Sequence, residues 1–194
     1  MQAQLHTRPE TSFTRWVVDD EADHKALNSE LLSQYKDQYG QTLAQMSRFD
    51  ATLVVFLRHL GCTFCRETVH DIFHQRKLIE ADGAKIAFVH MAEEDVAQSF
   101  FESFNVEDIP RFSDPSKKLY QGFGLKRGGL RALFGLKVIK RGFEAVKKGF
   151  GGPKIMGDVS QMPGVFLIRS LKILQAFKHQ YASDRPNYIR IARS

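Results

Sequence analysis

The chain contains several short runs of consecutive apolar residues that have the right length for buried strands. Residues 51–59 (ATLVVFLRH) and 85–90 (KIAFVH) combine β-branched residues with an unbroken apolar core, a pattern typical of buried parallel strands. Residues 165–169 (VFLIR) predict a further strand, and so do residues 172–178. These runs predict the strands of one central sheet.

Between the strands, apolar residues recur with the helical period. Helices are expected over residues 19–39, 41–49, 66–83 and 92–104, and Asp114-Pro115 predicts a turn. Because strands and helices alternate, we expect an α/β sandwich in which helices cover an open sheet. We assign residues 1–49 to an N-terminal tail and helical extension, and residues 50–194 to the main domain.

Residues 122–154 differ in composition from the rest of the chain. They hold nine of the fourteen glycines and nine basic residues against a single acid, Glu144, so their net charge is +8. The whole chain carries +6, which leaves −2 for the remainder. Apolar residues thread the same segment, and their spacing predicts one or two amphipathic helices. We interpret residues 122–154 as a basic, glycine-rich helical insertion.

The composition argues against several classes of protein. With 43% apolar and 11% aromatic residues the chain can build a sizeable core, so intrinsic disorder is not expected. Two cysteines do not suffice for a secreted disulfide scaffold, and no apolar run approaches the roughly 18 residues of a membrane-spanning helix. The first twenty residues lack the apolar core of a secretory signal, so we expect a cytoplasmic address.

The motif that carries chemistry is Cys62-Thr63-Phe64-Cys65, at the junction between a buried strand and a helix. Unpaired N–H groups and the positive end of the helix dipole favour a thiolate at this position. Arg58, Arg66 and His59 add positive charge nearby, so we expect at least one thiol with a lowered pKa. Such a thiolate attacks a peroxide oxygen or a disulfide sulfur, and the second cysteine then closes an intramolecular disulfide.

A zinc site and a pair of inert buried thiols are the two other interpretations of these cysteines. A structural zinc site needs two more ligands, but the chain has no second CxxC, and only His70 and His74 form a cluster nearby. The strand-to-helix context favours redox chemistry over both alternatives. We therefore assign no metal to the motif.

Four segments of the chain resemble a known family. They are LVVFLRHLGCTFCRE (53–67), DPSKKLYQGFGLKRGGL (114–130), GDVSQMPGVFLI (157–168) and the ending formed by His179, Asp184 and Pro186. They resemble the peroxiredoxin-like branch of the AhpC/TSA antioxidant family that carries a CxxC motif, a branch related to selenoprotein L and prostamide/prostaglandin F synthase. The resemblance extends over about residues 50–190 and includes a similar glycine-rich insertion.

The resemblance implies a thioredoxin-like fold with a central mixed sheet covered by helices. It also implies thiol-dependent reduction of hydroperoxides or related oxidised substrates. No bound cofactor is implied, because thioredoxin or glutathione serves as the external thiol reductant. The peroxide-binding arginine of ordinary peroxiredoxins has no counterpart here, since Arg169 is displaced along its strand.

The resemblance leaves two alternatives for the attacking cysteine. Ordinary peroxiredoxins attack with the cysteine that overlays Cys65, whereas thioredoxins attack with the first cysteine of the motif. We favour Cys62 as the attacking residue, because we expect it to be exposed at the very start of the helix, and Cys65 as the resolving residue.

Other residues near the motif allow two interpretations each. Pro163 precedes a strand, where thioredoxin-like proteins hold a cis-proline against the CxxC; the alternative is an ordinary trans turn. His59 either tunes the thiols or is a hydrogen-bonded histidine at the end of a strand. Phe64 lies between the cysteines and can form an apolar lip for an organic substrate. We interpret the chain after the last strand as a surface turn that contains His179, Asp184 and Pro186.

The insertion at 122–154 can pack on the fold as a lid or a dimer surface, bind an anionic membrane, or contact nucleic acid. The similar insertion of the family favours packing, with a membrane surface second and nucleic acid last. We predict a peroxiredoxin-like enzyme that acts on a small-molecule hydroperoxide or disulfide. The alternatives are a thiol–disulfide oxidoreductase of protein disulfides and a non-catalytic, redox-sensing binding module.

Overall fold

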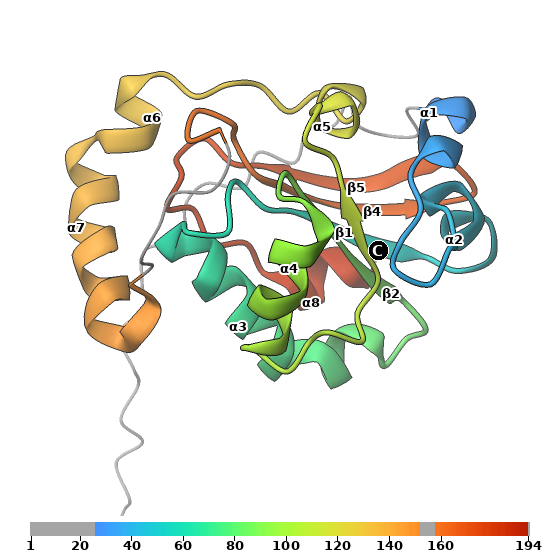
Figure 1. Cartoon of the computed structure of the whole chain (residues 1–194), viewed down its shortest axis with the longest axis horizontal. Helices are drawn as coiled ribbons and strands as arrows, with labels where there is room; N and C mark the ends of the chain where they lie inside the picture. The colour runs from blue at the N-terminus through green and yellow to red at the C-terminus, as the bar shows by residue number, and fades with distance from the viewer. Residues whose placement is uncertain (1–25, 152–157, 194) are drawn as a thin grey trace, which may run out of the picture.

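A computed structural model describes residues 26–151 and 158–193 (Figure 1). The strands within these residues are β1 (Thr52–Phe56), β2 (Lys85–His90), β3 (Arg111–Ser113), β4 (Gly164–Arg169) and β5 (Lys172–Lys178). The helices are α1 (Ser29–Gln34), α2 (Leu43–Phe49), α3 (Thr63–Glu80), α4 (Glu94–Glu102), α5 (Lys118–Gly122), α6 (Leu130–Phe134), α7 (Leu136–Ala145) and α8 (Tyr188–Ala192). A short π-helical turn, η2 (Val146–Phe150), follows α7.

The strands form one mixed sheet in the order β3-β2-β1-β4-β5. β1 pairs in parallel with β2 and antiparallel with β4, while β2 pairs in parallel with β3 and β4 antiparallel with β5. The expectation that residues 51–59 and 85–90 form buried strands is confirmed, and the parallel character expected of 51–59 holds for its pairing with β2 but not for its pairing with β4. β1 is the central strand of the sheet. The loop that follows it therefore lies at the carboxyl end of the central strand, between the ends of its neighbours (Figure 1).

Alternate residues of the central strands supply two separate cores. In β1, Leu53 and Val55 belong to the core beneath α3, α4 and α8, whereas Val54 and Phe56 belong to the core beneath α1, α2 and α5. This alternation is what a strand buried on both faces requires. The expected α/β class, with a central mixed sheet covered by helices, is confirmed.

The N-terminal helix is much shorter than the predicted 19–39. α1 begins after Asn28, whose side chain accepts a hydrogen bond from the backbone of Leu31. Before it, the N–H of Leu27 donates to the carbonyl of Leu171 at 2.8 Å, so the chain here is tied to the end of the sheet. Residues 19–25 lie outside the described residues. The prediction was wrong on both sides of α1 because tertiary pairing overrides helical periodicity at these positions.

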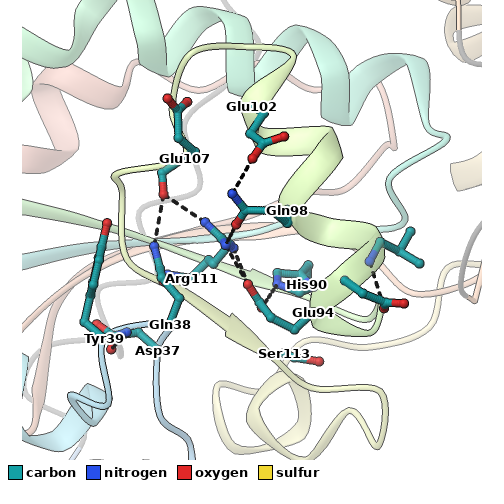
Figure 2. Close-up of polar contacts among 12 residues, drawn as sticks. Asp37, Gln38, Tyr39, His90, Glu94, Gln98, Glu102, Glu107, Arg111 and Ser113 are labelled. Atoms are coloured by element: carbon teal, nitrogen blue, oxygen red, sulfur yellow. Dashed lines mark hydrogen bonds and ion pairs between the residues drawn. The ribbon is translucent and has the colours of Figure 1, made fainter.

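A buried arginine links β3 to α4 (Figure 2). Arg111 is 2% exposed, and its guanidinium donates to the carboxylate of Glu94 at 2.7 Å, to the carbonyl of Glu107 at 2.9 Å and to the amide oxygen of Gln98. The same guanidinium lies over the ring of Phe101. β3, which the apolar pattern did not predict, is held in the sheet by these contacts as well as by its pairing with β2.

Candidate active site

The loop after β1 brings both cysteines to the N-terminal end of α3. The N–H of Cys62 donates to the carbonyl of His59 at 2.9 Å, which closes the turn between strand and helix. Cys62 is the residue that precedes the first turn of α3, and Cys65 lies within that turn. The predicted junction is thus confirmed, although the helix begins at Thr63, earlier than expected.

Both thiols are buried, contrary to the expected exposure of Cys62. Cys62 is 5% exposed and Cys65 is 3% exposed, and the two are not joined by a disulfide. Phe64 is half-buried between the main core and a small cluster formed by Leu133, Val138, Met162 and Ala182. Two of those four residues come from the insertion, so the insertion helps to cover the cysteine turn.

An ion pair fixes the insertion to the helix that carries the motif. Arg141 of α7 donates two hydrogen bonds to the carboxylate of Glu67 on α3, the shorter at 2.6 Å, and Glu67 is buried. Val138 and Ala145 of α7 are also buried. In Figure 1, α7 stands beside the N-terminal end of α3. The prediction of amphipathic helices within 122–154 is confirmed, and one face of them packs on the fold.

The surroundings of Cys62 favour its thiolate. A hydrogen bond from the thiol of Cys65 lowers the pKa of Cys62 most, and the charge of Arg58 and backbone hydrogen bonds from Cys65 and Phe64 lower it further. These effects outweigh burial and bring the pKa of Cys62 to about 6. The guanidinium of Arg58 lies 3.7 Å from the Cys62 sulfur. Cys62 is therefore mostly ionised at neutral pH.

Cys65 has the opposite environment, although it lies one helical turn away. Burial raises the pKa of Cys65 most, and its hydrogen bond to Cys62 and the negative charge of the Cys62 thiolate raise it further. The backbone N–H of Arg58 donates to the Cys65 sulfur at 3.2 Å. The pair therefore consists of a thiolate at Cys62 and a protonated thiol at Cys65.

Arg58 is held in place by a segment distant in sequence. Its guanidinium donates to the carbonyl of Val159 at 2.6 Å. Val159 lies in a turn that Asp158 stabilises by accepting hydrogen bonds from the N–H and the hydroxyl of Ser160. The ammonium of Lys117 also donates to the carboxylate of Asp158 at 2.8 Å. This turn therefore positions the cation beside the thiolate.

Arg66 and His59, the other two residues expected to add positive charge, do not supply charge to the thiols. The guanidinium of Arg66 lies over the rings of Phe100 and Phe104, at 5.9 and 5.0 Å from their centroids. Burial, followed by the charge of Arg58, lowers the pKa of His59 to about 4, so its imidazole is neutral at neutral pH. Its Nδ1 has no hydrogen-bond partner among the described residues, so the interpretation as a hydrogen-bonded histidine is wrong for that atom.

Pro163 lies beside the cysteines, but the described residues contain no cis peptide bond. Of the two interpretations of Pro163, the cis-proline is therefore wrong and the ordinary trans bond is confirmed. Pro163 lines a small cavity of about 10 Å³ together with Arg58, Phe64 and Cys65. That volume is close to what one water molecule needs.

The sequence interpretation missed two residues that line the same cavity, His179 and Asp184. The Asp184 side chain is 3% exposed, and burial lowers the pKa of His179 to about 4. The interpretation of this segment as a surface turn is wrong, because His179 and Asp184 of the turn after β5 line the cavity beside Cys65, and Pro186 is buried. The His…Asp-x-Pro ending was the only sequence signal that could have found them.

No three histidine, cysteine, aspartate or glutamate side chains within 26–151 and 158–193 gather in a way that could hold a metal ion. His70 and His74, the pair considered as zinc ligands, face each other on α3 with 3.0 Å between their Nε2 atoms. No helix in the same ranges is long and apolar enough to cross a bilayer.

Comparison with known proteins places the chain in a family. Residues 72–182, more than half of the chain, match the family described as AhpC/TSA antioxidant enzyme. The chain is 25% identical to prostamide/prostaglandin F synthase of Danio rerio over 158 residues, which are 78% of this chain and 77% of that protein. The family match begins after the CxxC motif, so the assignment of roles to the two cysteines rests on their geometry.

Solved structures share the fold. The bacterioferritin comigratory protein of Xanthomonas campestris superposes with a TM-score of 0.56 at 15% identity, over 80% of this chain and 88% of that chain. Peroxidoxin BcpB of Mycobacterium tuberculosis gives a TM-score of 0.54 at 19% identity, over 77% and 82%. The thioredoxin-like fold implied by the resemblance is thereby confirmed.

Proposed function

The chain belongs to the AhpC/TSA antioxidant enzyme family, and from this membership we propose that it is a thiol peroxidase that reduces hydroperoxides through Cys62 and Cys65. The observation that carries the proposal is the asymmetry of the pair. Cys62 has a pKa of about 6 and a cation 3.7 Å from its sulfur, whereas Cys65 stays protonated beside it. A stable thiolate next to a thiol is what attack and resolution require.

In the first step the Cys62 thiolate attacks the terminal oxygen of the hydroperoxide. The O–O bond breaks, the leaving alkoxide takes a proton to become an alcohol, and Cys62 becomes a sulfenic acid. The Nε of Arg58 is buried and has no hydrogen-bond partner among the described residues. This donor is therefore free to bind a peroxide oxygen, which stabilises the charge that develops on it.

In the second step Cys65 forms a disulfide with Cys62. Conversion of Cys62 to a sulfenic acid removes the negative charge that helps to raise the pKa of Cys65, so Cys65 becomes easier to deprotonate. The Cys65 sulfur then displaces hydroxide from Cys62, and the thiol proton leaves with that hydroxide as water. An external dithiol such as thioredoxin, or two molecules of glutathione, reduces the disulfide and completes the cycle.

Access to the sulfur requires movement of the covering side chains. The cavity beside Cys65 has room for about one water molecule, so an organic hydroperoxide reaches Cys62 only when Phe64 or the insertion residues packed against it move aside. Phe64 is then placed to contact the organic part of the substrate, in keeping with the predicted apolar lip.

Single cysteine variants test the assignment of roles. We expect Cys65→Ser to consume one equivalent of hydrogen peroxide and to accumulate a sulfenic acid on Cys62, which dimedone and mass spectrometry detect. We expect Cys62→Ser to be inactive and unlabelled, because the remaining thiol is protonated. A dimedone adduct on Cys65 in Cys62→Ser would show that the roles are reversed.

A second candidate function is reduction of protein disulfides, which the low pKa of the first cysteine of a CxxC motif also favours. Turnover of hydrogen peroxide, an organic hydroperoxide and insulin disulfides by the wild type, with dithiothreitol or thioredoxin as reductant, discriminates between the two. Insulin reduction without peroxide turnover would replace the proposed function. Oxidation once, without cycling under either reductant, would instead favour a redox-sensing module.

A further inference from the structure

The outer face of the insertion exposes an unusual amount of apolar surface. We define this outer face by Leu130, Phe134, Leu136, Ile139, Phe143 and Val146, which are between 47% and 88% exposed. Only five other large apolar side chains are exposed in the rest of the described chain, and they are not gathered in one segment. A concentration of exposed apolar residues of this kind marks an interaction site.

The outer face is a continuous stripe on α7 and the turn after it. Leu136, Ile139, Phe143 and Val146 occur at positions i, i+3, i+7 and i+10, a spacing that places them on one side of a helix. Val138 and Ala145, on the opposite side, are buried against the fold. α7 is therefore already packed on its inner side, and the stripe is apolar surface that residues 26–151 and 158–193 leave exposed.

Lysine side chains border this stripe. Lys140 and Lys147 lie four residues after Leu136 and Phe143 and are exposed, and so are Lys148 and Arg131. Arg141 and Lys137 contribute less free charge because they pair with Glu67 and Asp184. The sole acid of the segment is Glu144.

This combination of features discriminates among partners. A second copy of the chain would bring two strongly basic faces together, and their repulsion opposes self-association. Nucleic acid would pair with the lysines but would leave the apolar stripe in water. An anionic bilayer satisfies both features, because the apolar side chains enter the acyl boundary while the lysines meet lipid phosphates.

We propose that the outer face of α6 and α7 docks the protein on an anionic lipid surface. The inner side of the same helix covers the cysteine turn, through the packing of Val138 near Phe64 and the pairing of Arg141 with Glu67. Docking therefore brings the proposed peroxidase site close to the bilayer. Resting on the proposed function, this placement assigns lipid hydroperoxides as a substrate class, reduced to lipid alcohols by the same two thiols.

Vesicle binding tests the docking without reference to activity. The reduced full-length protein is co-sedimented with phosphatidylcholine vesicles with and without phosphatidylserine. We expect binding only when phosphatidylserine is present, and loss of that binding as salt is raised. Leu136→Ser combined with Phe143→Ser should weaken binding by about tenfold or more, because both side chains lose their apolar transfer into lipid. Lys140→Glu combined with Lys147→Glu should weaken it by at least about tenfold.

A matched control separates the outer face from apolar exposure in general. Phe49 is 76% exposed and lies elsewhere on the fold, against 68% for Phe143, so Phe49→Ser should bind vesicles as the wild type does. Failure to bind phosphatidylserine vesicles overturns the proposal, as does equal loss of binding in Phe49→Ser. A concentration-dependent dimer that Phe143→Ser abolishes, without vesicle binding, would assign the face to a second copy instead.

Two readouts separate this proposal from the proposed function. Cys62→Ser should lose peroxide turnover and keep vesicle binding, whereas Phe143→Ser should keep turnover of hydrogen peroxide in solution. With phosphatidylcholine hydroperoxide in phosphatidylserine vesicles as substrate, Phe143→Ser should be slower than the wild type. Equal rates of the two proteins on this substrate would refute the assignment of lipid hydroperoxides, even if both proteins bind the vesicles as expected.

Discussion

Two buried arginines, Arg58 and Arg111, have nearly the same exposure but very different partners. Arg111 is 2% exposed and donates to a carboxylate, a side-chain amide and a backbone carbonyl (Figure 2). Arg58 is 6% exposed and donates to the carbonyl of Val159 and, over 3.7 Å, to the sulfur of Cys62. Among the described residues no carboxylate lies within ion-pair distance of Arg58.

The difference shows how one fold uses the same side chain for structure and for chemistry. A buried cation is unfavourable unless an anion accompanies it. Arg111 has a permanent anion, Glu94, so its charge is neutralised in the folded protein. Arg58 obtains an anion only when Cys62 ionises, so the field of Arg58 favours the thiolate. Because no carboxylate neutralises the charge of Arg58, that charge is available to stabilise the Cys62 thiolate.

The largest expected effect is on stability, from the loss of Arg111. Arg111→Met should lower the free energy of unfolding by about 4 kcal/mol, because three acceptors, on Glu94, Gln98 and Glu107, lose their donor at about 1–1.5 kcal/mol each. Arg58→Met is the matched comparison and should cost less, about 1–2 kcal/mol, since one carbonyl loses its donor and the Cys62 thiolate loses its cation. Urea unfolding measures both, and equal losses in the two variants would contradict the comparison.

The same contrast separates what could be predicted from the sequence. Arg58 and the two cysteines are close in sequence, so the apolar run of β1, the CxxC spacing and the helix after it predicted their positions, whereas the distant acceptor of Arg58, the carbonyl of Val159, was not predicted. β3 has three residues and no period to recognise, and the partners of Arg111 come from α4 and the loop before β3. No local sequence pattern predicts this hydrogen-bond network around Arg111.

The parts of the site that were missed come from distant segments. His179 and Asp184 lie more than one hundred residues after the cysteines, and only the fold brings them to the cavity. The burial of both thiols escaped prediction for the same reason, because Leu133 and Val138 of the insertion help to cover the turn. Exposure at a helix start is a local expectation, and packing from a distant segment reverses it.

A smaller effect on stability is expected from acid, and it tests the Arg111 side of the comparison. His90 is fully buried near Glu94, and burial followed by a smaller effect of Arg111 lowers its pKa to about 4. Between pH 6.5 and 4 the unfolded chain binds a proton at this histidine and the folded chain does not, so stability falls as pH falls through that window. The contribution of His90 is on the order of 3 kcal/mol.

Replacement of His90 by an apolar ring isolates this contribution. His90→Phe should lose less stability than the wild type when urea unfolding at pH 4 is compared with pH 7, because no proton is bound on unfolding at this position. His74→Phe, at an exposed histidine of α3, is the control and should follow the wild type. If His90→Phe lost as much stability as the wild type, the burial of a neutral His90 would not contribute to acid unfolding.

The smallest expected effect is on the thiolate itself, and it separates two neighbouring arginines. Arg58→Met should raise the pKa of Cys62 from about 6 to about 7, a change of about 1.4 kcal/mol, because the hydrogen bond from Cys65 remains while the cation is lost. The ultraviolet absorbance of the thiolate and the pH profile of peroxide consumption both report this pKa. Arg66→Met should leave it unchanged, since the Arg66 guanidinium lies over Phe100 and Phe104. A similar shift in both variants would mean that the field at Cys62 is diffuse rather than set by Arg58.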